Sequence, residues 1–430
     1  MPPVAIVMNM FYTGLGIARS LGEHGTPVIG LSSHRGIYGN FTRYATVHRC
    51  PDSREQPEAL ATYLMRMGAE LGSRAIIFPT RDDDIVFLDR FRGELSKRFN
   101  MVIPDSSAVE ASLDKWETYL SAKRAQVATP KCWLVEDEQD LRRFAPELTY
   151  PCVMKPVASR DWRRGGNWEI VGGRKVIGVS SWDQLKAEYT AVASADRRVL
   201  LQEMIPGGDD CLVIAACYLD RQSNLVAGFN TQKLVQSPDG FGTGCIVQTV
   251  DRPELFDPTI RLLQAMRFSG IAEVEYKWDA RHRIFQLIEI NPRPWDQHRL
   301  GKACGTDLVY LAYCDHAGLP IPTAKRHVSS QKWIAEDAFL MEALRLLRMR
   351  DPALRSFLRQ AHGKRSYAIW SVKDPLPFLG FMAARFLPML ARAASRLLLS
   401  ALKEKMPGKV FLRKKGWTYE SYLEKRKSHS

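Results

Sequence analysis

The strongest constraint on the fold comes from residues 270–291, which have the pattern of a β-hairpin. Apolar and polar residues alternate on both sides of a short polar turn near His282, and this period of two is typical of paired strands. With the turn centred there, Glu275 lies directly opposite Glu289. Odd-numbered positions share one face of such a hairpin, and that face carries Glu273, Glu275, Glu289 and Asn291.

Two carboxylates that face each other across a hairpin destabilise it unless a cation lies between them. Two carboxylates and an amide oxygen are suitable ligands for Mg²⁺, a hard ion that takes few protein ligands and also binds phosphates. The pattern alone leaves two alternatives. Either water solvates an exposed hairpin face, or Lys277 and Arg293 neutralise the carboxylates.

The first hundred residues alternate short apolar runs with helix-like stretches, and this order favours an open parallel α/β sheet. The expected strands are Val4–Met8, Val28–Leu31 and Ala75–Phe78, and the expected helices are Thr13–His24 and Glu58–Gly72. Gly14 and Gly16 follow the first strand, but the third glycine of a dinucleotide-binding loop is missing. The pair therefore favours a tight turn over a nucleotide contact.

The middle of the chain carries further candidate binding elements. Asp114-Lys115 opens a predicted helix, a short predicted strand ends at Lys155, and a glycine-rich loop follows at residues 159–167. Glycines at this density indicate mobile backbone or a close approach to a ligand. Beyond this loop we expect the strands Val199–Met204, Cys211–Leu219, Leu225–Phe229, Ile271–Trp278 and Ile284–Ile290.

Together these motifs resemble the ATP-grasp superfamily, and within it the carboxylate–amine ligases of the D-aspartate-ligase-like and predicted carboligase group. The resemblance covers about residues 1–320. Its five motifs, in order, are Asp114-Lys115, Val153-Met154-Lys155-Pro156, the glycine-rich loop, Gln202-Glu203-Met204-Ile205-Pro206, and Glu275 followed by Glu289-Ile290-Asn291-Pro292-Arg293. It implies a mixed α/β and α+β fold. The implied parts are an N-terminal open parallel α/β domain (1–105), two lobes of an ATP-grasp core (106–198 and 199–325) and a basic α-helical C-terminal extension (326–430).

The resemblance also implies ATP and Mg²⁺ as cofactors, with one or two ions and with Mn²⁺ as an alternative ion. Lys115 and Lys155 then contact the ATP phosphates, and Lys155 also reaches the adenine. The implied metal ligands are Glu275, Glu289 and Asn291.

The adenosine contacts implied by the resemblance lie near the boundary between the two lobes. Glu203 is expected to bind the adenine amino group, and the backbone of Met204 and Ile205 forms the hinge contacts. Asp210 is expected to bind the ribose hydroxyls, with the neighbouring Asp209 as the alternative.

The remaining candidates concern the transferred phosphoryl group and the substrates. The resemblance assigns Arg293 to the phosphoryl group or acyl-phosphate. Lys233 is a candidate for orienting the substrate carboxylate or the γ-phosphate, and its alternative is a solvated surface lysine. The loop at 159–168 is either a flap over the phosphates or an element that recognises an anionic or aromatic co-substrate. Trp295, Asp296 and His298 are candidate linings of the acceptor pocket, and His298 is a candidate base or a structural residue.

The implied reaction is ATP-dependent ligation of a small-molecule carboxylate to an amine through an acyl-phosphate. Phosphoryl transfer depends mostly on positioning and charge neutralisation, so the chain needs no side-chain nucleophile for it. Two alternatives stay open: a small-molecule kinase of the same fold, or a nucleotide-binding membrane adaptor without catalytic activity.

The net charge of +14 arises in the last quarter of the chain. Residues 1–325 carry 39 basic and 39 acidic residues, whereas residues 326–430 carry 22 and 8. In the apolar segment 381–405, four bases fall on one side of a predicted helix: Arg385, Arg392, Arg396 and Lys403. This pattern is typical of helices that lie in a membrane surface. Docking of this helix on the protein is the alternative. Nucleic-acid binding ranks last, because aromatic residues do not alternate with the bases.

Other features favour a cytoplasmic protein, in contact at most with the inner face of a membrane. The eight cysteines include no C-x-x-C pair, which argues for reduced thiols and against structural zinc or disulfides. The first residues lack the pattern of a secretory signal. No uncharged apolar run reaches the roughly 18 residues of a membrane-spanning helix.

Overall fold

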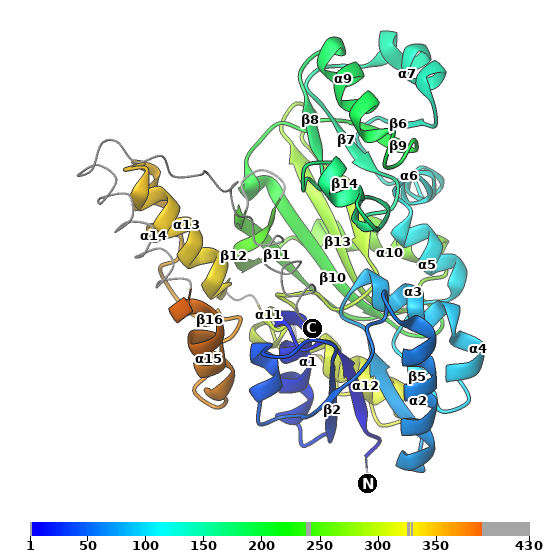
Figure 1. Ribbon diagram of the computed structural model, residues 1–430, viewed down its shortest axis with the longest axis vertical. Helices are drawn as coiled ribbons and strands as arrows, with labels where there is room; N and C mark the ends of the chain where they lie inside the picture. Colours follow the sequence, from blue (N-terminus) through cyan, green and yellow to red (C-terminus); the bar gives the residue numbers. More distant parts are fainter. Residues whose placement is uncertain (1, 238–241, 325–326, 328–329, 389–430) are drawn as a thin grey trace, which may run out of the picture.

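The computed structural model describes residues 2–237, 242–324, 327 and 330–388. Its strands form three sheets, with a five-stranded sheet at one end of the molecule, a four-stranded sheet at the other and a seven-stranded sheet between them (Figure 1). The fold is therefore of the mixed α/β kind that the sequence predicts.

The five-stranded sheet is parallel throughout, with the strand order β3-β2-β1-β4-β5. The strands are β1 (Ala5–Met8), β2 (Val28–Ser32), β3 (Thr46–Arg49), β4 (Ala75–Phe78) and β5 (Phe99–Met101), with helices α1 (Tyr12–Gly22), α2 (Pro57–Leu71), α3 (Asp82–Arg90) and α4 (Arg92–Leu95). Strands β1 and β4 are fully buried, which accounts for their uninterrupted apolar sequences. Gly14 and Gly16 lie within α1 and not in the predicted tight turn. A Cβ atom at Gly14 would lie 1.8 Å from the carbonyl oxygen of Asn9, so Gly14 lets the connection from β1 pass close to the helix.

The four-stranded sheet has the order β6-β9-β7-β8. Its strands are β6 (Cys132–Val135), β7 (Cys152–Pro156), β8 (Ile177–Val179) and β9 (Val199–Glu203), and its helices are α7 (Glu138–Phe144), α8 (Asn167–Ile170) and α9 (Trp182–Val192). The helices α5 (Ser106–Leu113) and α6 (Lys115–Arg124) precede it. The glycine-rich loop connects β7 to α8.

The seven-stranded sheet has the order β14-β13-β10-β11-β12-β15-β16. Its strands are β10 (Leu212–Leu219), β11 (Leu225–Ser237), β12 (Thr243–Val250), β13 (Gly270–Asp279), β14 (Ile284–Asn291), β15 (Lys332–Ile334) and β16 (Arg365–Tyr367), and α10 (Phe256–Ala265), α11 (Leu300–Ala303) and α12 (Leu308–His316) lie along it. Along β10, Val213 faces a core shared with α10, whereas Ile214 faces a core shared with α1 and α12. The second core brings the N-terminal part of the chain against the face that carries Glu275, because Ile214 pairs with Glu275.

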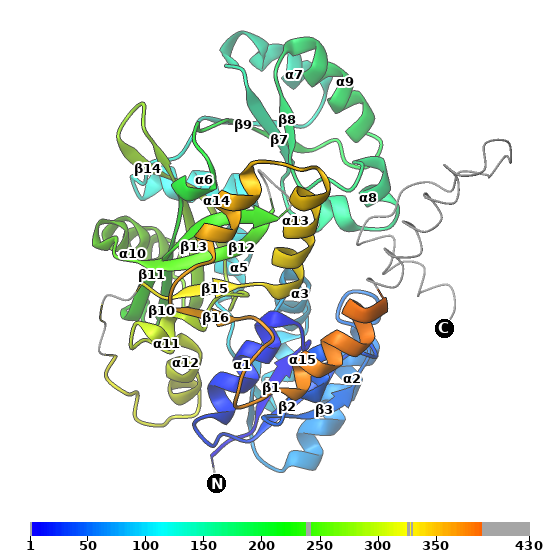
Figure 2. The same cartoon turned by 90° about the vertical axis from the view of Figure 1, so that its left-hand side faces the viewer.

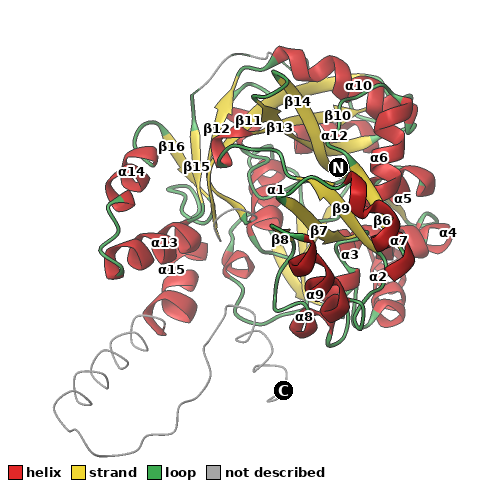
Figure 3. Ribbon diagram, turned by 90° about the horizontal axis from the view of Figure 1, so that it is seen from above, coloured by secondary structure: helices red, strands yellow, loops and turns green. Residues whose placement is uncertain are grey.

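Residues 332–367 differ from the all-helical extension that the sequence predicts. The helices α13 (Glu336–Arg348), α14 (Ala353–Gln360) and α15 (Leu376–Phe381) are present, but β15 and β16 also extend the seven-stranded sheet. Figure 3 shows both strands at the end of this sheet. Pairing of Ile334 with Ile246 buries both side chains, and this tertiary contact outweighs the helical pattern of the flanking sequence.

Most of the predicted basic helix at 381–405 lies outside the described residues. The described part of it is the end of α15 and a single π-helical turn over Met382–Phe386. In the ranges that the structure describes, no helix has the length and apolar composition needed to cross a membrane.

Candidate functional site

Strands β13 and β14 pair in the predicted register. Glu275 lies opposite Glu289, and Glu273 lies opposite Asn291. The register shifts by one residue directly after Glu275, so that Tyr276 lies opposite Leu287. The two glutamates of β13 are buried, and this burial excludes the alternative of a solvated hairpin face.

The cation beside these carboxylates is Lys233, which comes from β11. Its Nζ atom donates to Oε2 of Glu275 at 2.5 Å, and Lys233 is itself buried. The alternative of a solvated surface lysine is therefore wrong. Burial raises the pKa of Glu275, and the Lys233 charge opposes this shift. Lys277, one of the two cations that the sequence offered to neutralise the carboxylates, lies opposite Gln286.

Glu289 is the point on which the predicted lysines converge. Burial opposes its ionisation, but the positive charges of Lys115, Lys233 and Lys155 outweigh burial and lower the pKa of Glu289. The three lysines come from α6, β11 and β7, which belong to different parts of the fold. The structure thus brings together residues that lie up to 174 positions apart in the sequence.

Hydrogen bonds fix the positions of Lys115, at the start of α6, and Lys155, in the four-stranded sheet (the smaller sheet below). Asp114 caps α6 by accepting hydrogen bonds from the backbone of Trp116 and Glu117, so Lys115 occupies the first position of the helix. Its Nζ atom donates to Oγ of Ser159 at 2.8 Å. On β7, Nζ of Lys155 donates to Oε1 of Gln202 at 2.7 Å. Burial lowers the pKa of Lys155 to about 8.

Asn291 connects the carboxylates of the hairpin. Its Nδ2 atom donates to Glu273 at 3.0 Å and lies 3.4 Å from Oε1 of Glu289. Burial raises the pKa of Glu273 to about 8. The sequence predicted Glu273 on this face but gave it no function. In the structure it is a third carboxylate, next to the predicted metal ligands.

On the hinge side, β9 ends at Glu203 and leads into Met204 and Ile205. The Glu203 carboxylate forms an ion pair of 2.8 Å with Arg281, which lies in the hairpin turn and also binds Asp279. Arg281 was not among the predicted site residues. Its contact joins the end of β9 to the turn between β13 and β14.

The structure distinguishes between the two candidate ribose ligands. The Asp209 carboxylate accepts hydrogen bonds from the backbone and side-chain nitrogens of Gln236, at 2.6 and 2.7 Å, and so fixes the end of β11. Asp210 is exposed. In the described part of the chain, its carboxylate lies 4.0 Å from the thiol of Cys211. Asp210 is the better candidate for a ligand contact.

Arg293 is held by Asp82, a residue that the sequence analysis did not single out. Nε of Arg293 donates to Oδ1 of Asp82 at 2.7 Å. Asp82 is the first residue of α3, on the parallel sheet. Burial opposes its ionisation, but the charges of Arg293, Lys115 and Arg163 lower its pKa. Asp82 therefore faces three cations from three separate segments.

Some side chains of the glycine-rich loop are buried in the protein core, and others are exposed to solvent. Trp162 is almost completely buried in the core of the smaller sheet, so it is not available to recognise an aromatic co-substrate. Arg163 and Arg164 are exposed. Arg163 lies over the ring of Trp168 at 5.7 Å and is one of the cations that face Asp82.

Of the three residues proposed for the acceptor pocket, two belong to the protein core. Trp295 is buried and stacks on Phe229 at 5.9 Å. His298 is buried beside the carbonyl oxygen of Thr13, and burial lowers its pKa; these contacts favour the structural alternative for His298. Asp296 is half-buried and accepts a hydrogen bond of 2.7 Å from Oγ1 of Thr13.

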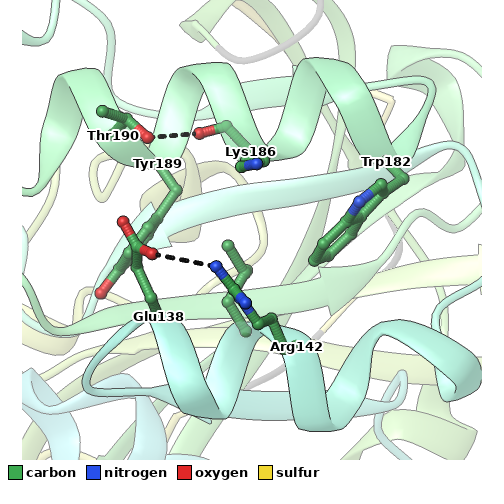
Figure 4. Close-up of a pocket in the computed structure, with 7 residues that line it drawn as sticks. Glu138, Arg142, Trp182, Lys186, Tyr189 and Thr190 are labelled. Carbon is green, nitrogen blue, oxygen red and sulfur yellow. Dashed lines mark hydrogen bonds and ion pairs between the residues drawn. The ribbon is translucent and has the colours of Figure 1, made fainter.

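A surface hollow between α7 and α9 is separate from this group (Figure 4). Its lining residues are Glu138, Leu141, Arg142, Trp182, Lys186, Tyr189 and Thr190. The polar contacts there are an exposed ion pair between Glu138 and Arg142 and a bond from Thr190 to the helix backbone. Such contacts are ordinary on helix surfaces, and none of the predicted site residues takes part.

Comparisons with known proteins bear on the segment that carries most of these residues. The family described as "Carbamoyl-phosphate synthase L chain, ATP binding domain" matches residues 114–322. The mitochondrial propionyl-CoA carboxylase alpha chain of Homo sapiens is 24% identical over 251 residues, which are 54% of this chain and 32% of the carboxylase chain. This chain therefore spans about a third of the length of that relative.

Two further matches cover more of the chain. The D-aspartate ligase of Enterococcus faecium is 22% identical over 299 residues, which are 66% of this chain and 69% of the ligase. The crystal structure of a biotin carboxylase complex from Campylobacter jejuni matches with a TM-score of 0.61 and 17% identity, over 75% of this chain and 73% of that one. At this identity the likeness shows a shared fold alone.

Proposed function

We propose that this protein is an ATP-grasp enzyme, an ADP-forming ligase that joins a small-molecule carboxylate to an amine, because residues 114–322 match a family model of an ATP binding domain. The observation that carries the proposal is the pair of Glu275 and Glu289, where Lys233 binds Glu275 at 2.5 Å and the charges of Lys115, Lys155 and Lys233 lower the pKa of Glu289. Three lysines around paired carboxylates provide the charges that a nucleoside triphosphate and its metal ion require. The similarity to a D-aspartate ligase supports carbon–nitrogen bond formation.

The nucleotide would lie between the smaller sheet and the metal hairpin. Lys115 and Lys155 bind its phosphates, and Glu203 binds the adenine amino group beside the backbone of Met204 and Ile205. Asp210 binds the ribose hydroxyls. Exposure of Asp210, in contrast to the bonded Asp209, supports this last assignment.

Glu275, Glu289 and Asn291 are the proposed ligands of Mg²⁺, which when bound neutralises the charge of the β- and γ-phosphates. The donor set fits this ion, because it offers oxygen atoms on one face of the hairpin, where Glu275 is buried and Glu289 and Asn291 are half-buried. No group of three or more His, Cys, Asp and Glu side chains is placed to hold a metal among the residues described. Phosphate oxygens would therefore complete the coordination of one or two ions, and Mn²⁺ is an alternative to Mg²⁺.

The proposed reaction has two steps. A carboxylate oxygen of the first substrate attacks the γ-phosphorus of ATP, ADP leaves, and an acyl-phosphate forms. The amine then attacks the acyl carbon, phosphate leaves, and the nitrogen loses a proton. Lys233 orients the carboxylate or the γ-phosphate. Arg293, held by Asp82, stabilises the charge on the transferred group.

We extend the proposal to the layout of the chain and its location. The strands of the three sheets support an N-terminal α/β domain at 1–105, ATP-grasp lobes at 106–198 and 199–325, and a C-terminal extension from 326 that lends two strands to the second lobe. The protein is proposed to work in the cytoplasm, with the basic C-terminal helix in peripheral contact with a membrane.

The test of the ligase proposal is phosphate release from ATP and Mg²⁺ with a panel of carboxylates, each with and without an amine mixture that includes D-aspartate. We expect release that needs both an acid and an amine and that Glu289→Ala abolishes. Glu254→Ala, on a solvent-exposed side chain of the same domain, is the matched control and keeps the activity.

Other outcomes identify the alternatives. A phosphorylated acid that accumulates without any amine indicates a kinase. ATP binding without turnover for every pair of substrates indicates the nucleotide-binding adaptor.

A further inference from the structure

The exposed apolar side chains of this molecule are concentrated in its C-terminal part. Ten of the 15 exposed large hydrophobic residues in the described chain lie between residues 341 and 387. They are Met341, Leu344, Leu347, Met349, Leu358, Trp370, Val372, Leu376, Leu379 and Leu387. Isolated exposed apolar residues are normal on protein surfaces, whereas a concentration marks an interaction surface.

Five of the ten belong to the neighbouring helices α13 and α14 and the turn between them. Met341, Leu344 and Leu347 recur every third residue and so lie within about 120° of the α13 circumference. The opposite sides of both helices are fixed, because Phe339 of α13 stacks on Phe357 of α14 at 4.9 Å. Figure 2 shows the two helices together on the side of the molecule that faces the viewer.

Exposed arginines surround these apolar side chains. Between residues 341 and 360 the exposed basic residues are Arg345, Arg348, Arg350, Arg355 and Arg359. The acidic residues of this segment, Glu342 and Asp351, are both half-buried, and Glu342 is paired with Arg345. The exposed surface of α13 and α14 is therefore apolar and cationic.

We propose that this surface, formed by the five apolar residues from Met341 to Leu358 and the five arginines, docks on an anionic lipid bilayer. Apolar side chains enter the interfacial region of a bilayer, and arginines reach the headgroup phosphates. A second copy of the chain fits less well, because it would bring five arginines against five arginines. Nucleic acid offers no partner for five exposed aliphatic side chains.

The inference deepens the proposed membrane contact and moves its centre from the basic C-terminal helix to α13 and α14. It does not depend on the ligase reaction, because lipid binding is measured without ATP or substrates. The result of the lipid-binding experiment therefore neither supports nor contradicts the ligase proposal, and the reverse also holds.

The experiment is co-sedimentation of the full chain with vesicles of phosphatidylcholine alone, or with 30 mol% phosphatidylglycerol. We expect binding to the anionic vesicles, weakened by salt. L344S/L347S should reduce the partition coefficient at least about tenfold. R348S/R355S should reduce it several-fold, and in anionic vesicles only. The control L319S/I321S removes two exposed apolar side chains elsewhere and should bind like the parent.

Thermal unfolding shows that each variant is folded, and the substituted side chains are exposed. The proposal is overturned if the full chain does not bind anionic vesicles. It is also overturned if L344S/L347S binds like the parent while R392S/R396S/K403S does not, because the contact then lies in residues 392–403. A further outcome is a chain that dimerises without lipid and fails to bind vesicles. If L344S/L347S abolishes that dimer, the surface binds a second copy of the chain.

Discussion

At the scale of single residues, burial of the Lys155 ammonium group, the proposed phosphate ligand, lowers the stability of the free protein. Burial lowers its pKa from 10.5 to about 8, so the folded state holds the charged amine less well than the unfolded chain does. Lys155→Met should raise the free energy of unfolding at pH 7 by about 1–3 kcal/mol and should abolish ATP binding. Chemical denaturation and nucleotide titration measure the two effects.

The stability that Lys155→Met gains should depend on pH, because proton binding and folding are linked. Below pH 8 the Lys155 amine is protonated in both the folded and the unfolded state, so burial of the charged amine has its full destabilising effect. Between about pH 8 and 10.5 the unfolded state binds more protons, so the stability of the parent rises with pH. The advantage of the methionine variant should shrink over that window. A gain that is constant from pH 7 to 10, or an equal gain for Lys186→Met on α9, would contradict this explanation.

The local placement of most candidate residues was predictable, because each belongs to a local pattern. Lys115 follows a helix cap, Lys155 ends a strand, and Glu275 and Glu289 alternate along a hairpin. Asp82 and Arg281 were not predictable, because each acts through a partner that is distant in the sequence or on another strand. Nothing in a run of three aspartates after β4 shows which of them reaches Arg293.

At the scale of elements, α3 positions Arg293, which lies two residues after the end of β14. Asp82, at the start of α3, binds Arg293 at 2.7 Å, and both side chains are largely buried. Asp82→Asn should lower kcat about 10- to 100-fold by removing a charge-assisted hydrogen bond, while the affinity for ATP stays within about twofold. Steady-state kinetics and nucleotide titration separate the two parameters.

Asp83→Asn is the matched control, because Asp83 is the next residue of α3 and its cationic neighbours are Arg81 and Arg54 rather than Arg293. Partial rescue by Asp82→Glu would support a positioning role. Equal losses in both asparagine variants, together with a lower melting temperature, would instead indicate a defect of α3 itself.

The hairpin register was the most predictable element, since a period of two and a short turn leave little freedom. The shift after Glu275 was not predictable. Lys233 was a candidate by its position, but its bond to Glu275 depends on the order of β13, β10 and β11 in the sheet. Sheet order is decided by packing between distant segments, and a single sequence carries little information on it.

At the scale of the whole molecule, the C-terminal part is integrated into the fold. The sequence predicted helices there and missed β15 and β16, because three-residue strands have no pattern of their own and form by pairing with β12 and with each other. Beyond them, the segment that holds Asp374 packs against α1 of the parallel sheet. The two ends of the described chain are therefore joined.

The contact that joins them is a buried ion pair. Nε of Arg19 lies 2.9 Å from Oδ2 of Asp374, and both side chains are 1% exposed. Arg19 also donates to the carbonyl of Ile369, and Thr42 donates to Asp374 at 2.6 Å. Removing one partner of such a pair leaves an uncompensated buried charge.

Asp374→Asn should therefore lower the free energy of unfolding by about 3–5 kcal/mol. Glu58→Gln, which breaks an exposed pair with Arg90, should cost less than about 1 kcal/mol. Hydrogen exchange should rise in Asp374→Asn at residues 365–386 and in α1, whereas β6–β9 stay protected, because the pair lies far from the smaller sheet. If both variants lose the same stability, or if exchange rises equally in every sheet, the Arg19–Asp374 pair does not hold the C-terminal segment against the parallel sheet.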